Sequence, residues 1–233
     1  IYTVGKFFSE VVHSVRRERP CFGGTKIVET GYPEYGNIEL QPYSPNIDSV
    51  LFLSTWEYEA GLWDDELLGR VLDILTSVRD TNDVSITVRP HPKDSQTKIE
   101  RYGSEFEISD QDCLVSDIDR HDMSLTSFST TILPSAIRGK VCGALHLPWE
   151  RNRFGPFTDP FVLQIDEEHT SIHYRSTRRT PEDQEQFLKQ YCFLPKYHHP
   201  GQFESPAEYI AMRLTHLLEN PPEHRAIHTI NSD

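Results

Sequence analysis

The sequence of 233 residues has few cysteines, no long apolar segment and little basic charge. The four cysteines lie far apart and form no CxxC pair, which favours a reducing compartment over a disulfide scaffold. No apolar run approaches the roughly 18 residues that a membrane-spanning helix needs. The formal net charge of −13 argues against broad nucleic-acid binding, so any phosphate site has to be a local basic pocket. We therefore expect a protein that is soluble or peripheral to a membrane and binds no nucleic acid.

The first part of the chain differs in character from the rest. Apolar residues at helical spacing predict a short amphipathic helix over 6–20. The glycines and prolines of 21–48 predict a linker or long loop. The chain also opens at Ile1, without an initiator methionine. We interpret residues 1–48 as a helix and linker that remain from a partner domain, and residues 49–233 as the main domain.

From residue 49 onwards the sequence predicts strands and helices in alternation. The predicted strands of this part are residues 50–53, 84–88, 106–108, 123–126, 141–145 and 161–165. One further short strand is predicted earlier, at residues 26–29 within the linker. The first predicted helix begins after Asp64, and the second covers 130–138 and ends at Gly139. Two more helices begin at Thr180-Pro181 and at Ser205-Pro206, and the latter leads into 209–218. The stretch 112–119 is ambiguous. Alternating strands and helices indicate an α/β fold with a Rossmann-like, doubly wound parallel sheet and C-terminal helices.

A rigid, cationic loop follows the predicted strand over 84–88. Its sequence is Arg89, Pro90, His91, Pro92 and Lys93. The prolines lack the N–H group that a strand ladder needs, so they end the strand and stiffen the loop. Ligands of open α/β sheets bind at the carboxyl ends of the strands. The loop therefore suits a phosphate, with the imidazole as donor and the guanidinium as a bidentate clamp; the alternative is a turn histidine without a chemical role.

Hydroxyl groups gather at two other predicted strand ends. Ser54 and Thr55 follow the strand over 50–53, and a second group precedes the helix over 130–138. The members of the second group are Ser127, Ser129, Thr130 and Thr131. Hydroxyls and free N–H groups at the start of a helix can bind an anion. The alternative is that one or two of these hydroxyls only cap the helix.

Carboxylates offer two weaker candidate sites. Asp117, Asp119, His121 and Asp122 form a cluster that could hold Mg²⁺ or Mn²⁺ with a nucleotide diphosphate. We prefer to interpret this cluster as an acidic loop and expect no metal site. Glu57 and Glu59 are the carboxylates nearest the expected cleft, so they are weak candidates for a catalytic role.

The two loops together resemble the C-terminal, nucleotide-binding half of GT-B glycosyltransferases that carry an HP motif and a serine motif. The nearest likeness is to bacterial polysialyltransferases and to CDP-glycerol glycerophosphotransferases of teichoic acid and capsule synthesis. The resemblance covers about residues 28–148. It rests on residues 50–56, on Arg89-Pro90-His91-Pro92, on Ser127-Phe128-Ser129-Thr130-Thr131, on the stretch from Ala136 to Val141, and on Gly31-Tyr32-Pro33. The sequence departs from many relatives in having Ser135 where they have Glu.

The resemblance implies a donor site for a cytidine nucleotide sugar, CMP- or CDP-linked, and no other cofactor. It implies that His91, Ser127, Ser129 and Thr130 bind the donor phosphates. It also implies a polysaccharide or glycolipid acceptor, a partner N-terminal Rossmann half and a cytoplasmic location that includes the inner membrane face. We expect His91 to be catalytic, through the charge of the departing phosphate, and Arg89, Lys93, Ser54, Thr55 and Thr131 to assist binding. The alternative is a non-catalytic domain that binds a nucleotide sugar or serves as a scaffold.

Overall fold

The computed structural model describes residues 2–3, 6–18, 28–29, 40–127, 129–147, 155–192, 211–212 and 215. Several predictions concern other residues. The turn-rich part of 21–39, Phe128 of the serine stretch and most of the helix predicted over 209–218 lie outside the described ranges.

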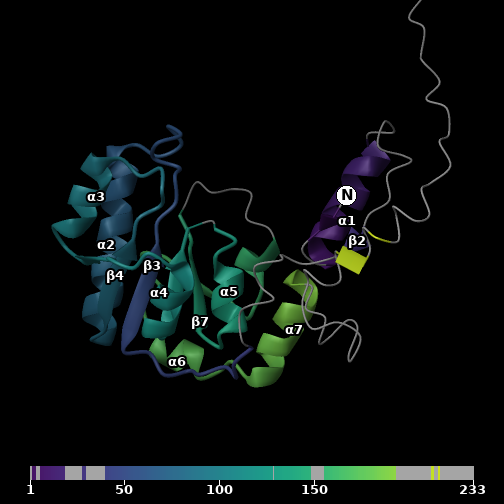
Figure 1. Cartoon of the computed structure of the whole chain (residues 1–233). Helices are drawn as coiled ribbons and strands as arrows, with labels where there is room; N and C mark the ends of the chain where they lie inside the picture. Colours follow the sequence, from purple (N-terminus) through teal and green to yellow (C-terminus); the bar gives the residue numbers. More distant parts are fainter. Residues whose placement is uncertain are drawn as a thin grey trace, which may run out of the picture.

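A six-stranded parallel sheet forms the centre of the molecule (Figure 1). Its strands are β3 (Ser49–Leu53), β4 (Ser85–Arg89), β5 (Glu107–Ile108), β6 (Met123–Thr126), β7 (Val141–Leu145) and β8 (Leu163–Ile165). The spatial order is β5-β4-β3-β6-β7-β8, with all neighbours parallel. This is the doubly wound order, and it confirms the predicted Rossmann-like fold. The point where the strand order reverses lies between β3 and β6.

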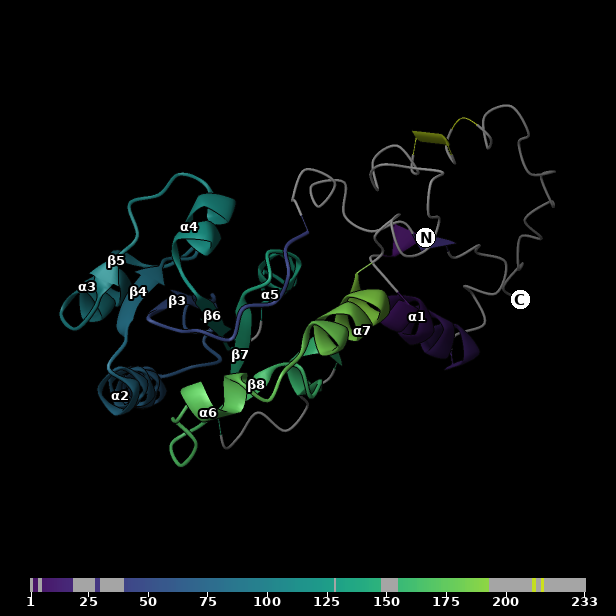
Figure 2. The same ribbon diagram turned by 90° about the horizontal axis from the view of Figure 1, so that it is seen from below.

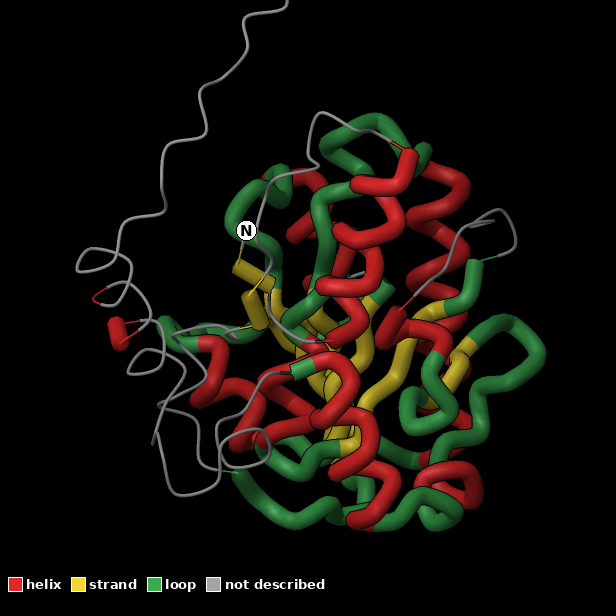
Figure 3. The backbone as a smooth tube through the Cα atoms, turned by 90° about the vertical axis from the view of Figure 1, so that its right-hand side faces the viewer, coloured by secondary structure: helices red, strands yellow, loops and turns green. Residues whose placement is uncertain are grey.

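Helices cover both faces of the sheet (Figure 3). The helices of this domain are α2 (Asp65–Asn82), α3 (Gln96–Gly103), α4 (Leu114–Arg120), α5 (Ile132–Ile137), η3 (Gly155–Thr158), α6 (His173–Ser176) and α7 (Pro181–Tyr191). Figure 2 shows α2 on one face and α4 with α5 on the other. Outside the sheet, α1 (Lys6–Glu18) contacts α7, and the two short strands β1 (Tyr2–Thr3) and β2 (Val28–Glu29) pair with each other. Among the described helices, none is long and apolar enough to cross a bilayer.

The central strands are largely buried because both faces of the sheet are covered. Every residue of β6 and β7 is buried, and only the first residue of β3 is partly exposed. The apolar stripe of α2 packs onto this sheet. Asp64 caps this helix by accepting a hydrogen bond of 2.8 Å from Leu67 N–H. These local signals position the loop between β3 and α2, which carries part of the candidate site.

Most predicted elements are confirmed, and several boundaries shift. The predicted bounds of β6 and β7 agree with the structure, the ambiguous stretch 112–119 contains α4, and Thr180 forms a capping box for α7. Helix α5 begins at Ile132 and ends at Ile137, so the prediction of 130–138 was too long. Residues 129–131 instead form a turn in which the Ile132 amide donates to the Ser129 carbonyl over 3.2 Å. The sequence analysis did not predict α3.

Candidate functional site

The three central strands end at the same level of the sheet. Leu53 is in register with Arg89 on one side and with Thr126 on the other. The segments that follow β3, β4 and β6 therefore leave the sheet side by side, at the point where the strand order reverses. Ligands of doubly wound sheets bind in the crevice at this point.

A pocket of about 280 Å³ joins the two predicted loops at this edge. It is lined by Leu53, Ser54, Arg89, Pro90, His91, Pro92, Leu114, Ser129 and Thr131. The proline-flanked loop forms one wall, and the hydroxyl turn before α5 belongs to the same lining. The sequence predicted that both loops would lie on the same edge of the sheet, and β4 and β6, which flank β3, bring them there. The binding role of each residue stays a prediction.

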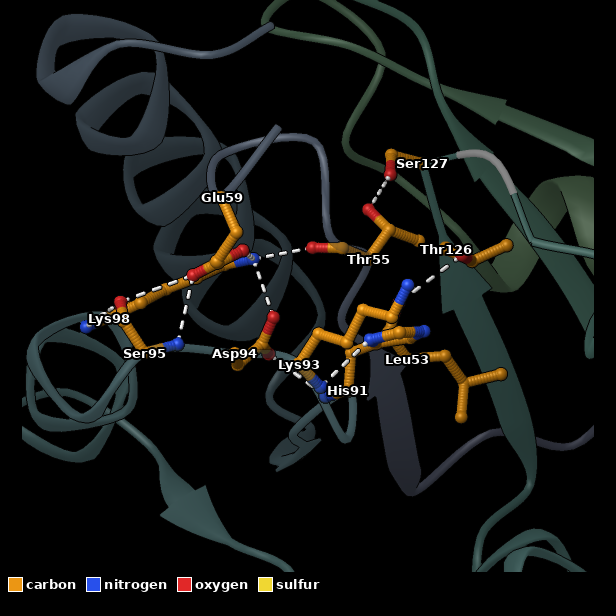
Figure 4. Close-up of polar contacts among 10 residues, drawn as sticks. All are labelled: Leu53, Thr55, Glu59, His91, Lys93, Asp94, Ser95, Lys98, Thr126 and Ser127. Atoms are coloured by element: carbon orange, nitrogen blue, oxygen red, sulfur yellow. Dashed lines mark hydrogen bonds and ion pairs between the residues drawn. The ribbon is translucent and has the colours of Figure 1, made fainter. Parts of the chain in front are cut away.

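Hydrogen bonds fix the ring of His91 in the pocket wall (Figure 4). The amide of Lys93 donates to His91 Nδ1 over 3.1 Å, and the amide of His91 donates to Asp94 Oδ2 over 2.8 Å. Because Nδ1 accepts a hydrogen bond, the proton of the neutral ring lies on Nε2. The ring therefore has one N–H group available to donate to a ligand.

The hydroxyls of Thr55 and Ser127 bond to each other across the ends of β3 and β6. Their oxygens are 2.6 Å apart, and both residues are buried. Neither residue is part of the pocket lining. This pair bridges the two central strands, and Thr126 Oγ1 adds a second bridge of 3.2 Å to the Leu53 carbonyl.

Ser129 and Thr131 form a hydroxyl pair at the pocket. Thr131 donates to Ser129 Oγ twice, from its own hydroxyl over 2.7 Å and from its amide over 3.3 Å. An oxygen that accepts two hydrogen bonds keeps its own O–H free to donate. Ser129 is thus a donor directed by its neighbour. Thr130 is exposed and lies outside the lining, as does Lys93, whose Nζ lies 4.8 Å from the Trp56 ring centre.

The Ser54 hydroxyl is buried in the pocket lining without a hydrogen-bond partner among the described residues. The nearby Tyr102 hydroxyl is also buried without a hydrogen-bond partner among the described residues. Burial raises the pKa of Tyr102. A buried hydroxyl without a partner costs free energy, so a ligand that accepts a hydrogen bond from Ser54 would remove this cost.

Arg89 is less free to bind phosphate than the sequence suggested. Its Nη1 forms an ion pair with Asp117 and donates to the Gln111 carbonyl over 2.9 Å. The Asp117 side chain is 2% exposed and also accepts from the Ser109 hydroxyl. Its carboxylate therefore offsets much of the arginine charge next to the pocket.

The other residues of the acidic cluster have structural partners. Asp119 forms a bidentate pair with Arg138, with distances of 2.6 and 2.5 Å. Asp122 accepts from the Ser49 hydroxyl over 2.8 Å at the opposite edge of the sheet. Within the described ranges, no group of three His, Cys, Asp or Glu side chains is arranged to hold a metal ion.

Sequence reasoning missed three contributors to the site. Leu114 lines the pocket from α4, within the stretch that was ambiguous in the sequence. Asp94 and Lys98 lie behind the proline-flanked loop, and both side chains are fully buried. The available signal was their spacing of four residues, with Asp94 just before α3 and Lys98 in its first turn. Ser135, where many relatives have Glu, is buried and donates to Ser124 Oγ over 2.7 Å.

Comparison with known proteins identifies the fold. No protein-family model and no curated protein matches the sequence. Two structures of the wall teichoic acid polymerase TagF match with TM-scores of 0.54 and 0.51 at 14% and 13% identity, the second soaked with CDPG. The matches cover 96% of this chain and 59% and 58% of the polymerase chain. KpsC of Thermosulfurimonas dismutans, a β-Kdo 2,4 transferase, matches with a TM-score of 0.36 at 17% identity, over 70% of this chain and 52% of that one.

The likeness to TagF shows that the chain has the fold of a GT-B half domain, as the resemblance implied. The chain spans less than two thirds of the polymerase it matches.

Proposed function

We propose that this chain is the donor-binding half of a glycosyltransferase or glycerophosphotransferase. Its substrate is a sugar or polyol phosphate activated by a cytidine nucleotide, used in the synthesis of a surface polysaccharide. One observation carries the proposal: the proline-flanked histidine loop and the hydroxyl turn before α5 line one pocket at the reversal point of the sheet. The shared fold with TagF, which has been soaked with CDPG, supports a cytidine nucleotide.

The pocket supplies neutral hydrogen-bond donors to a phosphate. His91 donates through Nε2–H, and Ser129 donates through the hydroxyl that its neighbour leaves free. Ser54 supplies a third, buried donor. As the bond to the transferred group breaks, negative charge grows on the nucleotide phosphate, and fixed donors stabilise that charge without reorganising. His91 is thus the catalytic residue of the proposal, through stabilisation of the leaving group.

The acceptor and the general base come from elsewhere in this proposal. An N-terminal Rossmann half supplies the general base and the site that binds the acceptor, which is a polysaccharide or glycolipid at the inner membrane face.

Nucleotide-dependent stabilisation tests the proposal. At a ligand concentration of 100 times Kd, binding stabilises the folded state by about 2.7 kcal/mol, which raises Tm by roughly 5–10 °C for a chain of this size. We expect CMP and CDP to raise Tm more than UDP does. His91→Ala should abolish the shift, whereas His169→Ala, which removes an exposed histidine remote from the pocket, should keep it. Absence of a shift with every nucleotide would refute donor binding.

A second candidate is a non-catalytic domain that binds a nucleotide sugar or serves as a scaffold. The pairing of Arg89 with Asp117 favours it, because a phosphate clamp would leave the guanidinium free. Transfer of radiolabel from a CDP-linked donor, assayed with the complete protein that contains the partner half, separates the two. A chain that binds CDP while the complete protein transfers nothing would be a binding domain.

A further inference from the structure

Lys98 is buried behind the candidate site, and neither the core nor the proposed chemistry accounts for it. Its side chain is 0% exposed. Its ammonium group donates to the Thr55 carbonyl, to Asp94 Oδ1 over 2.9 Å and to Glu59 Oε2 over 3.3 Å (Figure 4). A fully buried lysine is rare, since removing the charge from water is costly. Its three partners satisfy all three of its N–H groups.

The partners of Lys98 lead directly to the site. Asp94 receives Lys98 on Oδ1 and the His91 amide on Oδ2, so one carboxylate joins the lysine to the histidine. The Asp94 side chain is also 0% exposed. On the other side, the Thr55 carbonyl belongs to the segment that carries the buried hydroxyls. The ammonium group therefore connects the loops after β3 and β4.

Glu59 completes the network on the β3 side. Its Oε1 accepts from the amide and the hydroxyl of Ser95, over 2.9 and 3.1 Å. Burial raises the pKa of the Glu59 carboxyl, but hydrogen bonds from backbone N–H groups and the Lys98 charge outweigh burial and hold the pKa below its usual value. Glu59 is thus ionised at neutral pH, and both of its oxygens have partners within this network.

Apolar residues in place of Lys98 and its carboxylate partners would fill this part of the core at least as well. Replacing a buried ion pair by apolar residues is often neutral or stabilising, so the core alone gives no reason for a lysine here. The bonds of Lys98 end on segments that carry the pocket residues. The two prolines beside His91 provide no N–H groups, so the loop depends on Asp94 to hold its backbone.

We infer that Lys98 is a positioning residue of the candidate site: through Asp94 it holds the His91 loop so that Nδ1 faces the Lys93 amide and Nε2–H faces the pocket. This inference rests on the proposed function only for the identity of the ligand. Without Lys98, the Asp94 carboxylate loses its fixed partner, the loop relaxes, and the ring samples both neutral tautomers. The donor to a phosphate is then lost for part of the time.

Two measurements on the same variants test the inference. The first is the tautomer of His91 in the unliganded protein, from ¹⁵N shifts of the ring assigned by comparison with His91→Ala. The second is the Kd for CDP by calorimetry. We expect the wild-type ring to be a single Nε2–H tautomer and Lys98→Met to mix both. A hydrogen bond to a charged group contributes about 1.5–3 kcal/mol, so the affinity should fall roughly ten- to hundredfold.

A second variant covers the possibility that unpaired carboxylates prevent folding. Asp94→Asn combined with Lys98→Met removes both charges of the pair and keeps the shape of the site. The control is Asn82→Leu, which breaks the buried bonds from Asn82 to Val78 and Thr170. This control should lower Tm without changing the tautomer or the affinity.

The two measurements separate failure of this inference from failure of the proposed function. If either Lys98 variant folds and keeps the single tautomer and the wild-type Kd, the positioning role is overturned. If the tautomer mixes but the wild type binds no nucleotide, the positioning role holds and donor binding is wrong. If the affinity falls equally in Asn82→Leu, the effect is a general loss of stability, and the inference is also overturned.

Discussion

Gly139 gives the sharpest test of the structure, because Gly61 has the same backbone conformation without the close contacts and so provides a matched control. Both glycines have φ of +70°. A Cβ atom on Gly139 would overlap the carbonyl oxygen of Pro42 and lie 2.7 Å from the carbonyl carbon, whereas a Cβ on Gly61 would meet nothing within 4 Å. Alanine at either position therefore carries the cost of a left-handed backbone, but only Gly139→Ala adds a collision.

The magnitude follows from the surroundings of each glycine. A left-handed conformation costs an L residue about 1–2 kcal/mol, and this is the whole effect expected for Gly61→Ala. Around Gly139, the opposing backbone is held by bonds of 2.9 Å from the Gln41 amide to the Ile137 carbonyl and from the Ser44 amide to the Gly139 carbonyl. Relieving the overlap means breaking these bonds, at about 1 kcal/mol each. Gly139→Ala should thus cost about 3–4 kcal/mol.

Urea unfolding monitored by circular dichroism measures both values, provided that the free energy of unfolding depends on urea concentration with the same slope in both variants. We expect the midpoint for Gly139→Ala to fall by at least twice the shift for Gly61→Ala. Equal shifts would show that the segment over 40–45 does not press on the turn after α5. The reasoning from packing would then be refuted, while the backbone conformation would stand.

Three further predictions concern the strand ends and the thiols. Thr55→Val and Ser127→Ala should each lower the free energy of unfolding by about 1 kcal/mol, and in a double-mutant cycle their losses should not add; additive losses would mean that the two hydroxyls are not bonded. Burial raises the pKa of Asp122, but hydrogen bonds from residues at the start of β3 outweigh it and lower the pKa below its usual value. Asp122→Asn should therefore lower the free energy of unfolding by about 1 kcal/mol at pH 7, a modest value because solvent screens this half-buried group. This loss should shrink as the pH falls below about 4, where the carboxyl group becomes protonated. A loss that does not depend on pH would contradict the assignment. Hydrogen bonds from backbone N–H groups in the first turn of α4 lower the pKa of the exposed Cys113, while burial raises that of Cys142. Iodoacetamide at pH 7, followed by peptide mass mapping, should label Cys113 much faster, and equal labelling would contradict this.

The sheet could be predicted because its strands are marked by local composition. A continuous apolar run gave β7 its bounds, since a strand buried on both faces admits few polar residues. The N-cap Thr180, followed by Pro181 and two acidic residues, likewise located the start of α7. Such elements depend on neighbours in the chain, and a sequence displays those directly.

Helix α3 was not predicted from the sequence, and its composition explains why. It spans Gln96–Gly103, and its buried residues are Lys98 and Tyr102. A buried lysine breaks the rule that a helix presents an apolar stripe to the core, so the sequence pattern did not indicate a helix in this segment. The carboxylates that permit this burial are Asp94, four residues earlier, and Glu59, which comes from another loop. A local pattern cannot reveal a partner that only the fold brings near.

The pocket itself was predictable for a different reason. Two loops that follow strands in a doubly wound sheet meet if those strands are close, and the order of βαβ units largely fixes which strands are close. His91 and Ser129 lie in one pocket lining on this account. The turn before α5 was not predicted, because the hydroxyl side chains of 129–131 bond locally in place of continuing the helix.

Arg89 shows why the charge of a site is harder to read than its position. Next to a proline-flanked histidine, an arginine predicts phosphate binding, but the prediction assumes that no carboxylate reaches it. Asp117 does so from α4, 28 residues further along the chain. With that charge offset, the proposed phosphate site relies mainly on neutral donors, the His91 ring and the Ser129 hydroxyl. Neutral donors act over short distances and only when correctly directed, so a site of this kind depends on the residues that fix its loops more than a site built on free cations does.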